Sequence, residues 1–313
     1  MSENGHVHTT QTAVADAGVA LRAQSPEQLI DRVGVVGGGI MGCGIAEVCA
    51  KADLDVVLVE ADDATAAGAS ARLAESLKRA VSRGKLDVGA AEVAGDRILF
   101  TSDFSELADR ELVIEAVVER KDVKLEVFER LAAVVEDPAA ILASNTSSIP
   151  IVELAVAAAG RERQVLGLHF FNPVPVLSLV EIIPSLLTAD DVCERATRFV
   201  TGQLGKEPIT APDRAGFTVN ALLVPYILAA IRMLEQGLAT AEDIDRGMVA
   251  GCAHPMGPLA LADLIGLDTV MSVAETLYAE HREQLFAPPP LLQRLVAAGL
   301  LGRKSGRGLH SYE

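Results

Sequence analysis

The stretch RVGVVGGGIMGCG, residues 32–44, decides the fold of this chain. A short β-branched run ends in the glycine pattern Gly37-x-Gly39-x-x-Gly42, and a helical pattern follows to about residue 52. In this pattern Gly37 allows a tight turn, Gly39 lets the backbone approach a pyrophosphate, and Gly42 lets helix and strand pack closely. An anion is favoured at the amino end of the helix by free N–H groups and the helix dipole. The stretch therefore predicts a dinucleotide-binding turn.

An acidic residue in the right place strengthens this prediction. The next expected strand, residues 55–60, ends in Glu60. An acid there accepts hydrogen bonds from the adenosine ribose and repels a 2′-phosphate, which favours NAD over NADP. A flavin would also fit the turn, and the plain alternative is a glycine-rich turn with a surface glutamate. Ile40 and Met41, inside the turn, are expected cofactor contacts.

Strands and helices alternate after the glycine turn. We expect strands at 97–103, 111–117 and 140–145, and helices at 63–84 and 121–135. This alternation predicts a mostly parallel sheet with helices on both faces. After Pro208 the pattern changes to helices alone, including a long apolar helix at 216–237 and a capping box from Thr240 to Asp243. We expect no strand in this later part.

Composition limits the possible partners. The chain has 313 residues, half of them apolar, and a formal net charge of -16. This charge argues against a nucleic acid or an anionic membrane as the main partner. The four cysteines form no CxxC pair and none has metal spacing to a histidine, so we expect reduced, buried thiols in a cytoplasmic protein and no metal. Residues 1–30 lack the pattern of a secretory signal and are expected to be a disordered tail.

One histidine and one acid occur in the apolar stretch GLHFFNPVPVLSLVEII, residues 167–183. If 165–171 and 177–183 are antiparallel strands, His169 and Glu181 lie almost opposite each other. A carboxylate beside an imidazole orients the ring and fixes its tautomer, as a general base requires. A lone histidine in an apolar strand is more often a core residue, but the facing acid favours catalysis.

A second polar group follows the expected strand at 140–145. The sequence ASNTSSIPI places Asn145, Thr146, Ser147 and Ser148 at the carboxyl end of that strand. Ligands of open α/β sheets bind at this edge. A helix N-cap is the alternative explanation, but one serine would satisfy it.

Together these motifs resemble those of a known family. SNTSS, GLHFFNPVP, LVE, GFTVNALLVPY and HPMGP occur in order within residues 144–258. From about Arg32 to Tyr312 the chain is similar to the short-chain 3-hydroxyacyl-CoA dehydrogenases, and within them to the actinobacterial 3-hydroxybutyryl-CoA dehydrogenases. The resemblance implies NAD-dependent, reversible oxidation of the 3-hydroxyl of an acyl-CoA. It also implies a homodimer formed through the helical domain.

The predicted fold is an α/β Rossmann-type NAD-binding domain followed by an all-α domain. The first spans residues 31–213 and has a mostly parallel sheet with an antiparallel extension. The second spans residues 214–313 and is expected to serve substrate binding and dimerisation.

The resemblance also implies site residues. In catalysis His169 is the general base, Glu181 its partner, and Ser147 and Asn220 hold the substrate oxygen. The implied cofactor contacts beyond the glycine turn and Glu60 are Ala116, Val117, Glu119, Lys124, Asn145, Ser147 and Asn172. The implied substrate contacts are Ser76, Arg83, Ser147 and Asn220.

Some alternatives stay open at this level. Ala215 stands where the family usually has proline, and Ser148 could replace Ser147 as the catalytic serine. The same motifs would serve an enzyme acting on an acyl group held by a carrier protein. A non-catalytic NAD-binding relative is a third possibility, although His169, Glu181 and Ser147 are all present.

Overall fold

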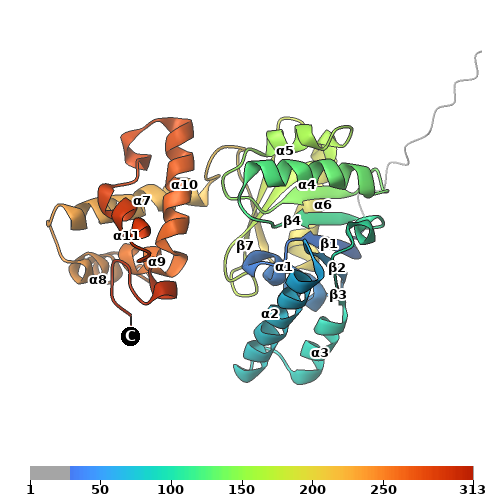
Figure 1. Ribbon diagram of the computed structural model, residues 1–313, viewed down its shortest axis with the longest axis horizontal. Helices are drawn as coiled ribbons and strands as arrows, with labels where there is room; N and C mark the ends of the chain where they lie inside the picture. The colour runs from blue at the N-terminus through green and yellow to red at the C-terminus, as the bar shows by residue number, and fades with distance from the viewer. Residues whose placement is uncertain (1–28, 313) are drawn as a thin grey trace, which may run out of the picture.

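The computed structural model describes residues 29–312, which form two lobes (Figure 1). The larger lobe is built on a sheet and the smaller one is helical. Residues 1–28 of the expected tail lie outside the described residues. Ile30, at the end of that expected tail, is instead 2% exposed, and its N–H donates to Gln203 Oε1 at 3.1 Å. The packed part of the chain therefore begins before the first strand.

The larger lobe contains one sheet of eight strands in the order β3-β2-β1-β4-β5-β6-β7-β8. Their bounds are β1 Arg32–Val36, β2 Asp55–Val59, β3 Ile98–Thr101, β4 Leu112–Glu115, β5 Ile141–Ser144, β6 Val165–Phe170, β7 Leu179–Pro184 and β8 Glu207–Thr210. The strands from β3 to β6 are mutually parallel. β4 and β5 are buried along their whole length, as strands covered on both faces must be.

β6 and β7 form the antiparallel extension. Their register pairs His169 with Glu181, as the spacing in the sequence predicts. The strand β8, parallel to β7, was not expected from the sequence. It is four residues long, only partly buried and contains Pro208, so it lacks the apolar run that reveals a buried strand. Proline is tolerated there because β8 is the edge of the sheet.

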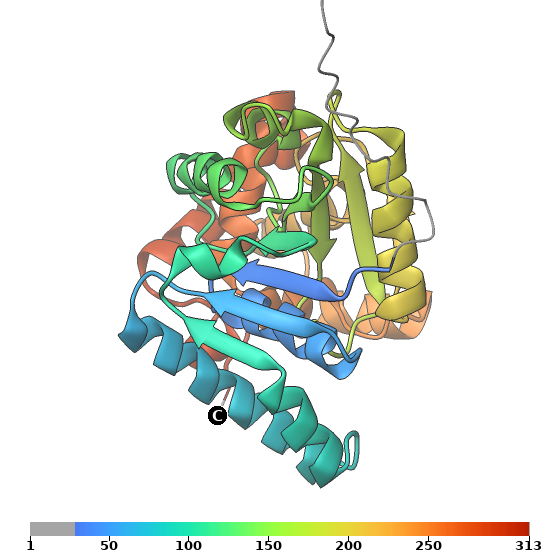
Figure 2. The same ribbon diagram turned by 90° about the vertical axis from the view of Figure 1, so that its right-hand side faces the viewer.

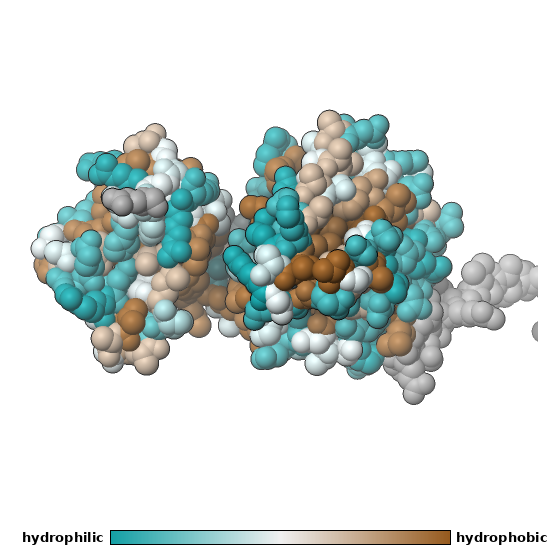
Figure 3. Space-filling model, turned by 90° about the horizontal axis from the view of Figure 1, so that it is seen from below, coloured by the Kyte–Doolittle hydropathy of each residue, from teal (hydrophilic) through white to brown (hydrophobic). Residues whose placement is uncertain are grey.

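Helices cover both faces of the sheet, as the alternating pattern predicts (Figure 2). One face packs against α1 Ile40–Lys51, α2 Asp63–Ser82, α3 Val88–Asp96 and α6 Asp190–Arg198. The other packs against α4 Lys121–Val134 and α5 Ile151–Ala157. Short helical segments complete the lobe at Phe104–Leu107, Glu162–Gln164 and Phe199–Gln203. Apolar side chains also gather on the face of this lobe seen in Figure 3.

The smaller lobe is helical, as predicted. Its helices are α7 Val219–Glu235, α8 Ala241–Cys252, α9 Pro258–Ile265, α10 Leu267–His281 and α11 Pro290–Ala297, with short segments at Gln284–Phe286 and Arg303–Ser305. Extended pairing among its described residues is limited to isolated bridges near Arg307. Thr240 caps α8 by accepting the N–H of Asp243 at 3.1 Å, which confirms the predicted N-cap. The carboxylate of Asp243 meets the hydroxyl of Thr240 at 3.0 Å and not its backbone N–H, so the capping box is only half formed.

The cysteines are free thiols, but they are not all buried as expected. Cys43 and Cys49 are buried, and burial raises the pKa of Cys49 to about 12. Cys193 is half-buried, and Cys252 is exposed at the last position of α8. Only the buried pair therefore fits the sequence prediction. Within residues 29–312, no helix is long and apolar enough to cross a membrane.

Candidate active site

The glycine turn has the geometry that its sequence predicts. Gly37 has a φ of 97°, and a side chain there would meet the backbone of Ala116. A Cβ on Gly42 would overlap the carbonyl oxygen of Gly37, so only glycine lets α1 pack so close to the turn. A Cβ on Gly39 would instead point into open space, and no side chain caps α1. The amino end of α1 is thus open to a ligand.

A cavity of about 630 Å³ extends from this turn between the carboxyl ends of β1 and β4. This is the point where the strand order reverses, the usual place for a dinucleotide in such a sheet. Among the residues predicted from the sequence, those that line the cavity are Gly37, Gly39, Ile40, Met41, Glu60, Ala116 and Val117. The glycine turn, Glu60 and the residues that follow β4 therefore line the same cavity.

Glu60 is held firmly at the end of β2. Its two carboxylate oxygens accept the N–H groups of Gly38 at 2.6 Å and Ala61 at 3.1 Å. A carboxylate has further lone pairs, so these bonds leave acceptor capacity toward the cavity. Phe104 and Arg130 also line this cavity and were not predicted from the sequence. There the guanidinium of Arg130 lies 4.0 Å from the ring centre of Phe104, and nothing in the local sequence marks this pair.

A second cavity, of about 360 Å³, lies where the two lobes meet. Met41, Ala116 and Val117 border both cavities, so the two are neighbours. The larger lobe contributes the predicted residues Glu119, Lys124, Asn145 and Ser147, together with Ser148. The helical lobe contributes four residues of α10 that were not predicted from the sequence, Asp268, Thr269, Ser272 and Val273.

His169 and Glu181 are in direct contact between β6 and β7. His169 Nδ1 lies 2.6 Å from Glu181 Oε2, and the two side chains are 4% and 0% exposed. The other oxygen of Glu181 accepts the N–H groups of Thr218 and Val219, both at 3.0 Å. The carboxylate is therefore clamped between the imidazole and the amino end of α7.

The other contacts of the His169 ring are with two aromatic rings and one hydroxyl group. The rings of Phe171 and Phe217 approach the imidazole edge-on, with centroids at 4.6 and 5.5 Å. His169 Nε2 lies 3.0 Å from Ser147 Oγ. Ser147 borders the second cavity, so its hydroxyl lies between that cavity and the buried imidazole of His169, which does not itself line the cavity.

The two candidate serines have different partners. Ser147 Oγ meets His169, whereas Ser148 Oγ donates to Glu119 Oε1 at 3.0 Å. This geometry favours Ser147 as the residue beside the reacting group. Both serines are set by the turn that follows β5, in which Thr146 Oγ1 accepts the N–H of Ile149.

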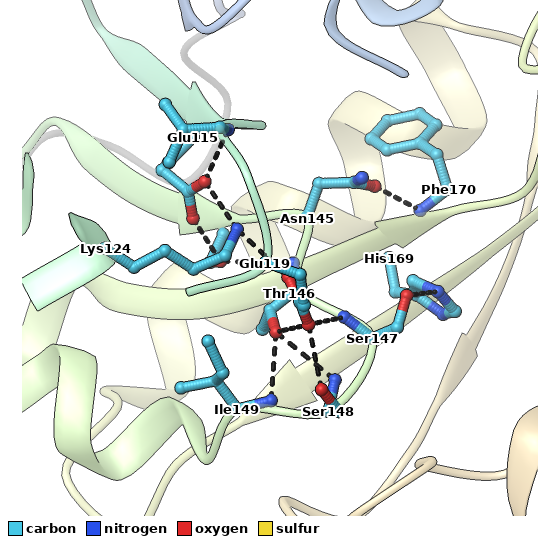
Figure 4. Close-up of polar contacts among 12 residues, drawn as sticks. Glu115, Glu119, Lys124, Asn145, Thr146, Ser147, Ser148, Ile149, His169 and Phe170 are labelled. Atoms are coloured by element: carbon cyan, nitrogen blue, oxygen red, sulfur yellow. Dashed lines mark hydrogen bonds and ion pairs between the residues drawn. The ribbon is translucent and has the colours of Figure 1, made fainter. Parts of the chain in front are cut away.

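A network of charged and hydrogen-bonding side chains supports that turn (Figure 4). Glu119 Oε1 accepts hydrogen bonds from Thr146 Oγ1 at 2.5 Å and the N–H of Ser147 at 2.9 Å, and Glu119 Oε2 lies 3.3 Å from Lys124 Nζ. Burial alone would raise the pKa of Glu119, but Lys124 and these hydrogen bonds lower it overall. Glu119 is therefore ionised at neutral pH. Lys124 also pairs with Glu115, a residue that was not predicted from the sequence.

Five predicted residues remain to be placed. Asn145 borders the second cavity, whereas Asn172, Asn220, Ser76 and Arg83 line neither cavity. Asn145 Oδ1 accepts the N–H of Phe170 at 2.8 Å, which ties the end of β5 to β6. Asn220 lies in the first turn of α7, next to the amide that binds Glu181. Asn172 is exposed just after β6. Ser76 Oγ donates to Glu47, and Arg83 is exposed at the end of α2.

Comparison with known proteins agrees with this geometry. Residues 32–214 match the family described as 3-hydroxyacyl-CoA dehydrogenase, NAD binding domain. Residues 216–312 match the family's C-terminal domain. The chain belongs to the 3-hydroxyacyl-CoA dehydrogenase family. The cofactor of this family's first domain, NAD, fits the open glycine turn, the cavity at the strand reversal and the acid at the end of β2.

Individual members of the 3-hydroxyacyl-CoA dehydrogenase family match over nearly their full length. A 3-hydroxybutyryl-CoA dehydrogenase of Mycobacterium tuberculosis is 53% identical over 90% of this chain and 99% of its own. The crystal structure of FadB2 from the same species has a TM-score of 0.90 at 52% identity, covering 91% of this chain and 100% of its own. The (S)-3-hydroxybutyryl-CoA dehydrogenase of Ralstonia eutropha has a TM-score of 0.84 at 45% identity, covering 91% and 99%.

Proposed function

We propose that this dehydrogenase catalyses the reversible, NAD-dependent oxidation of a short-chain (S)-3-hydroxyacyl-CoA, with 3-hydroxybutyryl-CoA and acetoacetyl-CoA as the substrate pair. The observation that carries the proposal is His169, held between Glu181 and Ser147, because Ser147 borders a cavity that adjoins the NAD-binding turn. The names of relatives that match over nearly their full length support the four-carbon substrate.

In this proposal His169 moves the proton. The substrate's 3-hydroxyl gives its proton to Nε2, the ring nitrogen that faces Ser147. Bound NAD supplies the hydride acceptor. Glu181 keeps the second ring nitrogen, Nδ1, protonated and stabilises the imidazolium as it forms. In the reverse direction the same imidazolium returns the proton to the ketone oxygen.

The amino end of α7 explains how a fully buried carboxylate can serve this role. An unpaired buried charge is costly, but two backbone N–H groups and the imidazole bond the two oxygens of Glu181. The helix dipole adds a favourable interaction with a negative charge at that end. These contacts offset the cost of burying the carboxylate and leave Oε2 free to face His169.

Ser147 and Asn220 are proposed to hold the substrate oxygen. Ser147 Oγ can donate to the oxygen as it gains carbonyl character, since it already lies within hydrogen-bonding distance of the base. Asn220 enters from α7, so the substrate oxygen would be held from both lobes. Glu119 and Lys124 are proposed to contact the nicotinamide ribose, and Asn145 and Asn172 the nicotinamide end.

A turnover assay tests the proposal. The purified chain is mixed with acetoacetyl-CoA and NADH, and the loss of NADH absorbance is followed. Turnover supports the proposal, and no turnover with either acetoacetyl-CoA or acetoacetyl-carrier protein would contradict it. Turnover with the carrier protein alone would favour the biosynthetic alternative. NADH binding without any turnover would favour a non-catalytic relative.

The cofactor proposal gives a further prediction. Because Glu60 presents a carboxylate beside the expected adenosine ribose, a 2′-phosphate would meet like charge and lose a ribose hydroxyl contact. We expect a clear preference for NADH over NADPH in kcat/KM, measured by steady-state kinetics with both cofactors. A preference for NADPH would show that Glu60 does not face the ribose.

Recognition of CoA is assigned to α2. Arg83 is exposed at the end of α2, and Ser76 lies two turns before it. We expect Arg83→Ala to raise KM for acetoacetyl-CoA and leave kcat nearly unchanged, since a contact to a distant phosphate is equally strong in substrate and transition state. Arg79→Ala removes a positive charge from another position of the same helix and serves as the control for loss of charge alone. An unchanged KM at low ionic strength would remove Arg83 from the CoA site.

The domain division, the oligomeric state and the cellular location of the protein remain expectations. The division of the chain near Asp213, the homodimer formed through the helical lobe, and a place in the cytoplasm follow from the family resemblance and the composition. Light scattering at micromolar concentration distinguishes a dimer from a monomer.

A further inference from the structure

Glu115 is a fully buried carboxylate that none of the proposed steps uses. It is the last residue of β4 and is 0% exposed. The parallel register places it beside Val36 of β1 and Ser144 of β5. It therefore lies in the middle of the sheet, directly beneath the edge where the cofactor and the reacting groups are expected.

Both oxygens of Glu115 have partners from separate segments. Oε1 accepts from Lys124 Nζ at 2.6 Å and from the N–H of Val117 at 2.7 Å. Oε2 accepts from Ser144 Oγ at 2.6 Å, and this hydroxyl in turn accepts the N–H of Thr146 at 3.1 Å. One side chain thus joins the turn after β4, the helix α4 and the turn after β5.

The charge of Glu115 has a specific consequence for Lys124. The lysine is 1% exposed, and its ammonium lies between Glu115 at 2.6 Å and Glu119 at 3.3 Å. Without Glu115 the buried ammonium would have one carboxylate partner and would move toward Glu119. The carboxylate of Glu119 also orders Thr146, Ser147 and Ser148, so the movement would reach the serine turn.

We propose that Glu115 is a positioning residue that holds Lys124, and through it Glu119, where the two meet the nicotinamide half of the cofactor. The inference rests on the proposed roles of Lys124 and Glu119. Glu115 itself does not touch the cofactor. A glutamine at this position can still accept the N–H of Val117 and hydrogen-bond to the hydroxyl of Ser144, so loss of the charge alone should act through Lys124. The effect of removing the charge should therefore be confined to the nicotinamide half and should disappear when Lys124 is absent.

The test uses Glu115→Gln, which keeps the shape of the side chain and removes its charge. Affinities for NADH and for ADP are measured by calorimetry without substrate. ADP contains the adenosine and both phosphates but lacks the nicotinamide ribose. We expect NADH to bind about 10- to 100-fold more weakly, the same loss that is typical when a metal ligand loses the partner that orients it. Affinity for ADP should stay nearly unchanged.

Two further variants separate positioning from general destabilisation. Glu111→Gln changes the residue just before β4, at the opposite end of the strand from Glu115. Glu111 accepts the backbone N–H groups of Asp31 and Arg32, and its replacement should leave the affinities for NADH and ADP unchanged. Lys124→Met should weaken NADH binding as Glu115→Gln does. The double variant Glu115→Gln/Lys124→Met should bind NADH no more weakly than Lys124→Met alone, since Glu115 then has no ammonium to place.

Several results would overturn the proposal. The first is a Glu115→Gln variant that binds NADH as tightly as the wild type. The second is a Glu115→Gln variant whose affinities for NADH and ADP fall by the same factor. The third is a double variant in which the losses of NADH affinity of the two single variants add in free energy. If Glu115→Gln does not fold, Glu115→Asp keeps the charge with a shorter reach and should weaken NADH binding but not ADP binding. Because these are binding measurements, a chain that binds NADH but does not turn over acetoacetyl-CoA would contradict the proposed function alone.

Discussion

Replacement of His169 by glutamine is expected to lower kcat by about 10²- to 10⁴-fold, the usual contribution of a general acid–base group. Glutamine can hydrogen-bond to Ser147 and Glu181 but cannot take a proton from the 3-hydroxyl. NADH binding should survive, because most of the expected cofactor contacts lie on the glycine turn, Glu60 and the β4–α4 segment rather than on His169. The measurements are steady-state turnover with acetoacetyl-CoA and a separate NADH titration.

The helical lobe offers a matched control for this variant. His281 stacks on Phe286 at the end of α10, and His281→Gln should leave kcat unchanged. Near-full turnover in His169→Gln would mean that His169 is a core histidine packed between Phe171 and Phe217. The base would then have to be sought among the titratable groups that border the second cavity.

Glu181→Gln is expected to be similarly severe, at about 10²- to 10⁴-fold in kcat, for a structural reason. The glutamine oxygen would accept the N–H groups of Thr218 and Val219, which leaves its NH₂ group facing His169 Nδ1. That nitrogen must then act as an acceptor, so the proton moves to Nε2. A ring protonated at Nε2 cannot accept the substrate proton.

A matched carboxylate and a stability measurement help to separate this effect from unfolding. Glu111→Gln changes a carboxylate that also accepts two backbone N–H groups, but just before the amino end of the central strand β4. This variant should retain full activity. Thermal unfolding of Glu181→Gln shows how much stability is lost. A folded Glu181→Gln enzyme with wild-type kcat would show that the carboxylate does not set the tautomer of His169.

Local sequence patterns were sufficient for the glycine turn and the paired strands. The turn depends on steric requirements at Gly37 and Gly42 that are visible in the spacing of the residues themselves. The pairing of His169 with Glu181 follows from the period of two in neighbouring strands joined by a short connection. Both features are short-range along the chain, so sequence reasoning could reach them.

The parts that sequence reasoning missed depend on contacts between distant segments. Glu115 reads as the polar end of a buried strand, and its role appears only once Lys124 and Ser144 are brought beside it. The α10 residues that border the second cavity are far from the other site residues along the chain. The edge strand β8 is short and half-exposed, so it has no clear periodic pattern.

The anchoring of Glu181 shows the same limit in another way. The sequence predicts the acid opposite His169 but gives no sign that the amino end of α7 holds its second oxygen. This contact joins β7 of the larger lobe to the first helix of the smaller one. The arrangement of the two lobes therefore helps to set the orientation of the Glu181 carboxylate.

The central claim is that His169 and Glu181 act as one unit, and a double-mutant cycle tests it most directly. The value of kcat for acetoacetyl-CoA reduction is measured for the wild type, His169→Gln, Glu181→Gln and the double variant. If Glu181 acts only through His169, the double variant should be little slower than either single variant, since residues that act as a unit are non-additive. Losses that multiply in the double variant would contradict the claim and show that the two residues work independently.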